Sequence, residues 1–582
     1  MLQPIARAGI IFLCMACAYV SYAQAEPRDV SLSVMRDVIE RYTSDKEALE
    51  RCYPVRLSDA RRERLGRFYS DQRKKLGDID FEKLDRAGRV DYLLLKNTLG
   101  FEVKQLEHAR KQFAEAAPLL PFAQGIVGLE ESRRRLEEMD GEKAAKVLAR
   151  ISEQVAEARK TLDAIAKASS ADATSKVIAD RAARTVDSLR YVLKNWHTFY
   201  DGYDPQFTWW MKQTYPKVEK ELEEYAGFLR KRGGAGEGDN DPVIGDPIGR
   251  EALIDALVAE MIPYTPEELI EIANREFVWC DKEMKRAATD LGFDGDWAKA
   301  LEHVSAMHVK PGEQPAMIKR LAEEATKFVE ERDLVTVPPL CKEIWRMEMM
   351  SPQRQKVNPY FTGGEIISVS FPTDAMTFED KEMSMRGNNP AFCHATVHHE
   401  LIPGHHLQIF MAERYNAHRK AFRTPFLVEG WALYWEMRLW DLGFARTPEE
   451  RVGMLFWRAH RCARIIFSLK FHLGQMTAPE AIDFLVKRVG HEKRNATAEV
   501  RRSVNGSYGP LYQAAYMLGG LQIRGLRKEL VESGKMTDRA FHDAVLREGA
   551  IPIEMIRGSL GQQELSRDFK SSWKFYPELG GE

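Results

Sequence analysis

The sequence lacks a net charge of either sign, and beyond its first 25 residues it lacks a long hydrophobic run. Its 85 lysine and arginine residues are offset by 87 aspartate and glutamate residues, and the formal charge of -2 is dispersed along the chain. This balance provides no electrostatic attraction toward nucleic acid or an anionic membrane. No later segment contains the ~18–20 uninterrupted apolar residues that a membrane-spanning helix requires. We therefore expect neither nucleic acid nor a membrane as partner.

The first 25 residues have the pattern of a secretory signal peptide. Arg7 is followed by an apolar run from about Ala8 to Val20, and then by the small-residue cleavage pattern Ala23-Gln24-Ala25. An uncleaved membrane anchor is the alternative, but the apolar run is short and ends in small residues. We predict that residues 1–25 are removed and that the mature protein is exported, as a periplasmic or secreted protein without a membrane span.

Cysteine is scarce in the mature chain. The cysteines that remain after cleavage are Cys52, Cys280, Cys341, Cys393 and Cys462. Because their number is odd, at least one thiol stays unpaired within the chain, and their spacing indicates no disulfide framework. The chain is nevertheless a folded protein, because 44% hydrophobic and 10% aromatic residues over 582 positions can build a large core.

Helical periodicity dominates the sequence and predicts a mainly α-helical fold. Glycines, aspartates and prolines interrupt this pattern between Lys231 and Gly249, which favours a loop. We therefore divide the mature chain into an N-terminal helical domain over residues 26–232, a linker over 233–249 and a catalytic helical domain over 250–582. No internal repeat suggests a further division.

Two local patterns predict individual elements. Thr265 is a typical N-cap residue, and Pro266 with Glu268 completes the start of a helix. The segment EIISVSFP, from Glu365 to Pro372, is rich in strand-forming residues and is bounded by glycines and a proline. This strand lies about thirty residues before a histidine cluster, so we expect a small β element near the functional site.

The histidine cluster, HATVHHELIPGHHLQ, begins at His394. A zinc peptidase helix normally reads HExxH, which places two histidines one turn apart with the glutamate beside them. Here His399-Glu400 begins such a motif, but the position that should hold the second histidine is Pro403. A catalytic zinc needs three protein ligands and an open position for water, which a neighbouring carboxylate can deprotonate. His399 and Glu400 therefore predict a first ligand and a general base.

The second ligand depends on how the chain turns at Pro403 and Gly404. Proline clashes with the carbonyl four residues earlier and glycine permits unusual backbone angles, so the helix should kink or bulge here. Such a turn would bring His405 to the metal. On a straight helix His406 would share the face of His399 but lie about 10.5 Å along the axis, too far for a common ion. We favour His405 and keep His406 as the alternative.

A following apolar helix, PFLVEGWALYWEMRLW, offers the third ligand. Glu429 and Glu436 stand on one face of it, and buried carboxylates are unfavourable unless they are paired or bind a metal. We predict Glu429 as the third ligand. Glu436 suits a partner that orients a ligating histidine, although an ion pair on the helix surface is an equal alternative.

The motifs HELIPGHHLQ, LVEGWALYWE, YGPLYQAAYMLGGLQIRGLR and FHDAVLREGAIPIEMI together resemble the bacterial domain-of-unknown-function 885 family. That family is similar to the gluzincin metallopeptidases of the carboxypeptidase Taq, oligopeptidase and angiotensin-converting-enzyme type. The resemblance implies a large helical zincin-like fold with a central groove, with His399, His405 and Glu429 as metal ligands and Glu400 as general base. The Pro-Gly insertion departs from those peptidases, and it leaves the choice between His405 and His406 open.

Oxyanion stabilisation requires a further donor. Similar peptidases use tyrosines from a late helix, which implies Tyr516 as first choice and Tyr512 as second, with Tyr508 close by in the sequence. We therefore expect an exported, Zn²⁺-dependent metallopeptidase that hydrolyses short peptides with metal-activated water. By analogy alone, the N-terminal helices should wall its groove.

Two alternatives stay open. One is a catalytically inactive helical protein with a structural or vestigial metal site, against which the intact Glu400 argues. The other is a zinc hydrolase of a non-peptide amide. Endo- or exo-cleavage, side-chain preference and oligomeric state cannot be read from this sequence.

Overall fold

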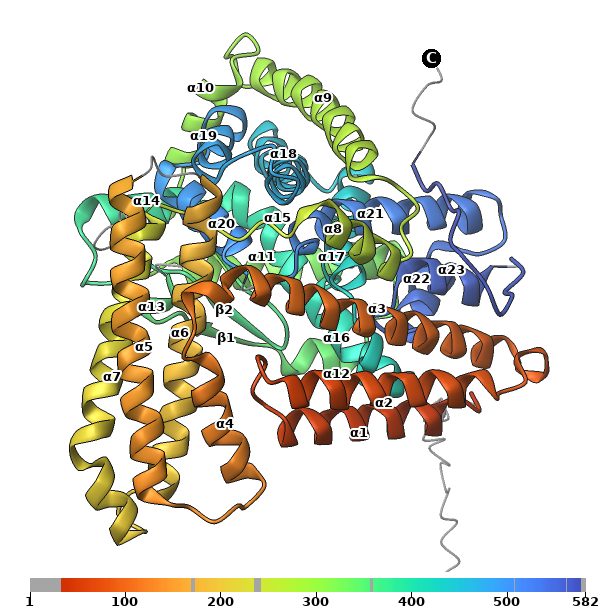
Figure 1. Ribbon diagram of the computed structural model, residues 1–582. Helices are drawn as coiled ribbons and strands as arrows, with labels where there is room; N and C mark the ends of the chain where they lie inside the picture. The colour runs from red at the N-terminus through yellow and green to blue at the C-terminus, as the bar shows by residue number, and fades with distance from the viewer. Residues whose placement is uncertain are drawn as a thin grey trace, which may run out of the picture.

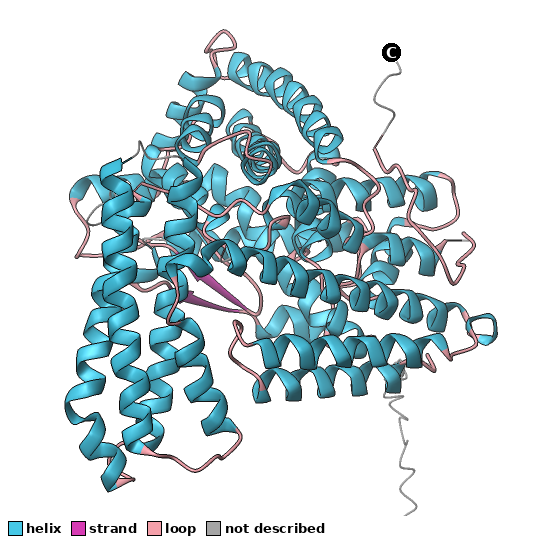
Figure 2. Cartoon of the chain, viewed as in Figure 1, coloured by secondary structure: helices cyan, strands magenta, loops and turns pink. Residues whose placement is uncertain are grey.

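The structure is a computed structural model that describes residues 33–168, 173–234, 242–355, 360–506, 508–561 and 563–576. The predicted signal peptide, residues 1–25, lies outside the described residues, as does part of the predicted linker. The protein is mainly α-helical, as predicted (Figures 1 and 2). In the part of the chain that is described, no helix is both long and apolar enough to cross a membrane.

The first helices pack onto the main body of the protein. They are α1 (Arg36–Cys52), α2 (Asp59–Gly77) and α3 (Arg86–Ala116). Buried residues such as Ile39, Phe68 and Leu95 belong to one apolar core that continues through residues of the second half of the chain up to Phe575. These helices are therefore held by long-range packing and not only by one another.

The next helices form a bundle with a core of its own. They are α4 (Ala123–Arg134), α5 (Gly141–Ala168), α6 (Ala173–Tyr200) and α7 (Pro205–Gly233), and they stand side by side at the left of Figure 1. Trp196, Phe207 and Leu222 are fully buried inside the bundle. The apolar cores thus separate α4–α7 from α1–α3, and the domain boundaries at residues 232 and 249 stay a prediction.

The middle of the chain carries helices and a small sheet. Its elements are α8 (Gly249–Ala259), α9 (Pro266–Asp290), α10 (Trp297–Ala306), α11 (Gln314–Glu331), α12 (Pro339–Ile344), β1 (Arg346–Met349), α13 (Pro352–Gln355), β2 (Ile366–Val369) and α14 (Phe378–Gly387). Helix α9 begins as predicted, with a capping box between Thr265 and Glu268.

The predicted strand is confirmed as β2, which pairs in parallel with β1 so that Arg346 lies opposite Ile366. The buried side chains of Ile367 and Val369 pack in one apolar cluster with Val397. Because Val397 lies two residues before His399, the sheet supports the helix that carries the histidine cluster.

The last part of the chain forms the centre of the molecule. Its helices are α15 (Pro390–Glu400), α16 (His405–Ala412), α17 (Pro425–Asp441), α18 (Pro448–His472), α19 (Ala478–Val489), α20 (Lys493–Val504), α21 (Tyr512–Arg527), α22 (Asp538–Arg547) and α23 (Ile553–Leu560). Helices α15, α17, α18 and α21 pack against one another in the interior.

Helices α17 and α21 approach closely because glycines face each other where they cross. A Cβ atom at Gly430 would lie 2.6 Å from the backbone of Gly519, and one at Gly519 would lie 2.8 Å from the Cα of Gly430. Interhelical distance depends on the side chains at the contact. The two glycines therefore let Glu429 of α17 and the tyrosines of α21 reach the same space.

We predict that Gly519→Ala destabilises the protein, because the added methyl group overlaps the Phe426 carbonyl and Gly430. Overpacking of this kind costs about 1–3 kcal/mol or more. Chemical denaturation of the wild type and the variant measures the loss. Gly66→Ala in α2 is the control, because a Cβ there meets no atom within 4 Å; equal effects of the two substitutions would contradict the argument.

Acid should destabilise the fold through buried neutral histidines. Burial lowers the pKa of His472 to about 4, against an opposing effect of Asp246, whereas an unfolded histidine titrates near 6.5. Unfolding therefore takes up a proton between these values, so stability is lost as the pH falls below ~6.5. From pH 7 to pH 5 one such group costs about 2 kcal/mol.

Denaturant unfolding of the wild type and of His472→Leu at pH 7 and pH 5 tests whether this histidine lowers stability in acid. The variant should lose about 2 kcal/mol less than the wild type on acidification. An identical loss in both proteins would show that His472 does not titrate in this way.

Candidate metal centre

The histidine cluster lies at a break between two helices. Helix α15 ends at Glu400 and α16 begins at His405, so the kink that the sequence predicts at Pro403 is a complete interruption. The amide of Gly404 donates to the carbonyl of His398 over 3.0 Å. A Cβ at Gly404 would collide with the carbonyl of His399, so only glycine permits this close turn.

The turn sends the two adjacent histidines in different directions. His405 points toward His399, and their ring centroids are 4.8 Å apart. His406 instead has its Nε2 2.8 Å from the carbonyl oxygen of Cys341. The structure therefore brings together His399 and His405, the favoured pair, and turns the alternative His406 away.

Helix α17 provides the carboxylates. The Glu429 Oε2 atom is 3.1 Å from Nε2 of His405 and 3.8 Å from Nε2 of His399. Glu436, about two helical turns later on the same face of α17, accepts a hydrogen bond of 2.7 Å from Nδ1 of His399. This bond orients the His399 ring so that its Nε2 faces Glu429 and His405.

Burial and charge both shape this cluster. Burial lowers the pKa of His399, but hydrogen bonds to Glu429 and Glu436 outweigh this effect and raise that pKa to about 9. Burial raises the pKa of Glu429, but His405 and His399 hold it well below its usual range. The carboxylates thus create an environment that favours positive charge between the histidines.

The residues fit a divalent metal ion. One ligand atom from each of His399, His405 and Glu429 lies within 4.8 Å of the others, and tetrahedral zinc with bonds of about 2.0–2.2 Å needs ligand atoms about 3.3–3.5 Å apart. Glu429 Oε2 is buried between the ring nitrogens of His399 and His405, and it has no well-aligned hydrogen bond among the described residues. A buried carboxylate oxygen of this kind is unfavourable unless something positive meets it.

A cavity of about 460 Å³ opens onto the cluster. Glu400 lines it together with the three candidate ligands, and burial raises the pKa of the Glu400 carboxyl above its usual value. Its volume lies within the range of small-ligand sites. Among the described residues the lining comes from the range 360–516, so the expectation that the N-terminal helices wall the site is wrong for this cavity.

The predicted tyrosines lie on the cavity wall. Tyr516 stacks on His399 with ring centroids 6.2 Å apart, and burial raises its pKa to about 12, so it remains a proton donor at neutral pH. Tyr512 donates a short hydrogen bond to Oε1 of Glu429. Tyr508 stands next to Tyr512, with ring centroids 4.4 Å apart. Tyr516 is thus closer to His399, and Tyr512 to Glu429.

The other histidines of the motif face away from the cavity. His394 stacks on Phe444 at 4.2 Å, and His398 meets the same ring edge-on. Cys393 is buried, and its thiol donates to the carbonyl of Asn388. None of these three side chains lines the cavity.

Sequence reasoning missed the arginines of the cavity lining, which are Arg423, Arg461, Arg464 and Arg502. Arg461 and Arg464 of α18 line the cavity beside Tyr516. Their signal in the sequence is basic residues three apart within an otherwise apolar stretch, RCARIIF, which indicates buried charge. That signal does not say which way the side chains point, and so it does not connect them to the histidine cluster.

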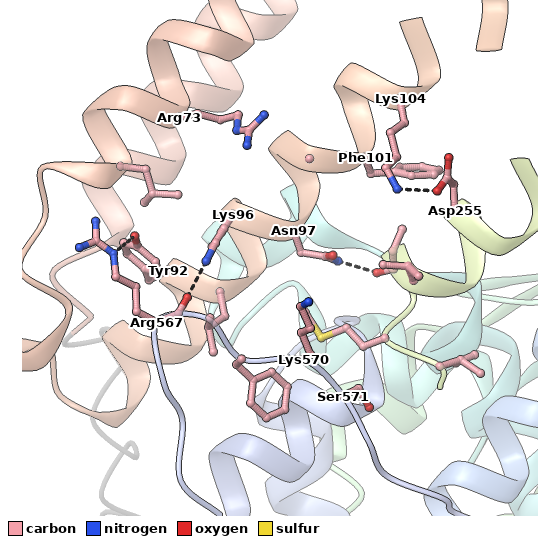
Figure 3. Close-up of a pocket in the computed structure, with 18 of the residues that line it drawn as sticks. Arg73, Tyr92, Lys96, Asn97, Phe101, Lys104, Asp255, Arg567, Lys570 and Ser571 are labelled. Carbon is pink, nitrogen blue, oxygen red and sulfur yellow. Dashed lines mark hydrogen bonds and ion pairs between the residues drawn. The ribbon is translucent and has the colours of Figure 1, made fainter. Parts of the chain in front are cut away.

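A larger cavity of about 710 Å³ lies elsewhere, between α3, α8 and the C-terminal segment (Figure 3). Its lining contains Asp255 but no histidine or cysteine among the described residues. Several of its polar groups join chain segments: Lys96 donates to the carbonyl of Arg567, and Asn97 to that of Ala259 (Figure 3). These polar groups therefore hold together the chain segments around this cavity.

Solved structures share this fold, and two of them are compared with this chain. One is described as "a putative lipoprotein of unknown function from Shewanella oneidensis"; it is 18% identical, with a TM-score of 0.65 over 89% of this chain and 98% of that one. The other is "the putative lipoprotein from Colwellia psychrerythraea", 16% identical, with a TM-score of 0.56 over 90% and 97% of the two chains. No curated protein matches the sequence.

The sequence itself carries the family assignment. The family model described as "Bacterial protein of unknown function (DUF885)" matches residues 52–560, which include the histidine cluster, both glutamates of α17 and the tyrosines of α21. The chain belongs to the DUF885 family.

Proposed function

We propose that this protein is a zinc-dependent metallopeptidase that hydrolyses peptide bonds in short peptides. The observation that carries the proposal is the convergence of His399, His405 and the buried Oε2 atom of Glu429, with Glu400 beside them in a cavity. A structural metal site is usually closed by a fourth protein ligand. Here three candidate ligands lie next to a cavity, with the carboxylate of Glu400 beside them, and this arrangement suits a hydrolytic site better.

The ion would be held by His399, His405 and Glu429. Bound zinc acts as a Lewis acid toward a carbonyl group and lowers the pKa of water to about 7. Glu436 keeps His399 in the tautomer that leaves Nε2 free to bind, and its hydrogen bond of 2.7 Å limits rotation of the ring.

The remaining chemistry falls to two side chains of the cavity wall. Glu400 takes a proton from the attacking water and passes it to the leaving amine, a role for which its burial-raised pKa is suited. The protonated hydroxyl of Tyr516 donates to the developing oxyanion. Tyr512 already donates a hydrogen bond to Glu429, so we assign it as the second choice for the oxyanion donor.

Two further points belong to this proposal. The segments HELIPGH and EGWA resemble the ligand motifs of gluzincin metallopeptidases apart from the Pro-Gly insertion, and this resemblance would imply a zincin-like fold. Export to the periplasm or medium is supported by the signal-peptide pattern of residues 1–25; two proteins of similar fold are described as putative lipoproteins.

Metal analysis of the purified protein, with hydrolysis of a mixed peptide library, tests the proposal. The wild type should bind about one zinc per chain and cleave peptides. His405→Ala and Glu429→Ala should lose the metal, whereas the matched control His406→Ala should keep it. Glu400→Gln should keep the metal and lose about 10²- to 10⁴-fold in activity.

Each other outcome has a distinct meaning. Metal bound without cleavage of any peptide, but with cleavage of other amides, would point to a hydrolase of non-peptide substrates. Metal bound without any hydrolysis would point to a structural site. A wild type that cannot be loaded with zinc would overturn the proposal.

The position of the general base gives a second prediction. Gly363 packs so closely on Glu400 that a Cβ would overlap its carboxylate and carbonyl. Gly363→Ala should therefore displace Glu400 and lower kcat about tenfold or more, while zinc content stays at the wild-type level. Gly387→Ala is the control, because a Cβ there approaches no atom closer than 3.9 Å; unchanged kcat in Gly363→Ala would contradict the assigned role.

A further inference from the structure

Two buried arginines border the candidate metal centre. Arg461 and Arg464 stand three residues apart on α18, and they are 5% and 2% exposed. Both guanidinium groups lie over the ring of Tyr516, with Cζ atoms 4.6 and 4.5 Å from its centroid. The same ring stacks on His399, so these cations flank the space in which a substrate would be cleaved.

The hydrogen-bonding capacity of these arginines is only partly used. Arg464 donates from Nε to Glu499 over 2.7 Å, but its Nη1 atom is buried without a partner among the described residues. Such a donor is unfavourable in a protein interior. Arg464 is thus anchored by Glu499 and still has a donor to offer.

Arg461 is less satisfied than Arg464. Its Nε atom is buried without a partner among the described residues. Its Nη2 atom is 3.6 Å from Oε1 of Glu436, which is beyond hydrogen-bonding distance, and that oxygen already accepts from His399. The carboxylate nearest to Arg461 therefore serves another residue first.

We propose that Arg461 and Arg464 bind a carboxylate of the substrate, which makes the enzyme selective for peptides that carry an acidic group close to the scissile bond. This inference rests on the proposed peptidase function. The planar guanidinium group matches a carboxylate through paired hydrogen bonds, and peptides supply that group at the C-terminus or on aspartate and glutamate side chains. Neutral surroundings for the rest of the substrate come from Trp457, Val428 and Ile409 in the same lining.

The charge of the cavity wall supports a carboxylate over a neutral group. A buried guanidinium without a hydrogen-bonded counter-ion is unfavourable, and a substrate carboxylate would provide one for Arg461. Removal of that carboxylate should then weaken catalysis strongly, because the buried donors are left unsatisfied.

Matched substrates test the selectivity. The peptide that the wild type cleaves best is synthesised with a free C-terminal carboxylate, as the C-terminal amide, and with each acidic side chain replaced by its amide. One of these neutralised forms should lose about 10- to 100-fold in kcat/KM. Loss with the C-terminal amide identifies the terminal carboxylate as the group bound, and loss with a side-chain amide identifies aspartate or glutamate.

Variants assign the selectivity to the arginines. Arg461→Gln should abolish the preference for the acidic form, and Arg461→Lys should restore part of it; Arg464→Lys should weaken the preference because it loses the planar fork. Arg451→Gln is the control on the same helix, since Arg451 pairs with Asp290 and does not line the cavity. A merely structural role would lower the rates for acidic and neutral peptides equally, and that result would overturn the proposal.

Failure of this inference can be separated from failure of the proposed function. If the wild type cleaves all forms equally well, the carboxylate site is refuted and the peptidase stands. If no peptide is cleaved, calorimetry on zinc-loaded Glu400→Gln with the tripeptide Ala-Ala-Phe and its amide decides. The carboxylate site is supported if the free tripeptide binds at least tenfold tighter than its amide and if this preference disappears when Arg461→Gln is added to Glu400→Gln. Equal binding of the two peptides, or no binding, refutes the site.

Discussion

The break in the chain between Glu400 and His405 is the constraint on which the candidate site depends. An uninterrupted helix would carry the next histidines along its axis and away from His399. The turn at Pro403 and Gly404 instead places the end of one helix against the start of the next. His405 thereby returns to His399, and Glu400 remains at the edge of the cavity. The close approach of Gly404 to the His399 carbonyl leaves little freedom for another residue there.

The remaining parts of the site are joined to that turn by contacts between central helices. The glycine contact between α17 and α21 brings Glu429 and the tyrosines to the same wall. A second set of contacts runs from His399 through Glu436 to Arg461 of α18. Orientation of the histidine and the charge of the cavity wall are therefore coupled, because both depend on one carboxylate.

Much of this arrangement could be predicted from local patterns. The capping residues at Thr265 predicted where α9 begins, and the Pro-Gly pair predicted a kink or bulge that favours His405 over His406. The pattern could not predict the partner of β2, since pairing with β1 is a long-range contact. Arg461 was missed for a similar reason: its apolar surroundings indicate burial, but only the packing of α18 on α21 shows what it faces. The expected wall of N-terminal helices came from analogy, and the cavity lining corrects it.

The separate core of α4–α7 has an evolutionary consequence. This bundle buries its own apolar residues, and its described side chains are not among those that line the cavity beside the histidine cluster. Substitutions in the bundle can therefore accumulate without disturbing the candidate metal centre, whereas α15, α17, α18 and α21 must change together. Divergence among relatives should be fastest in the bundle, where new surfaces can arise while the histidine cluster and its cavity are inherited unchanged.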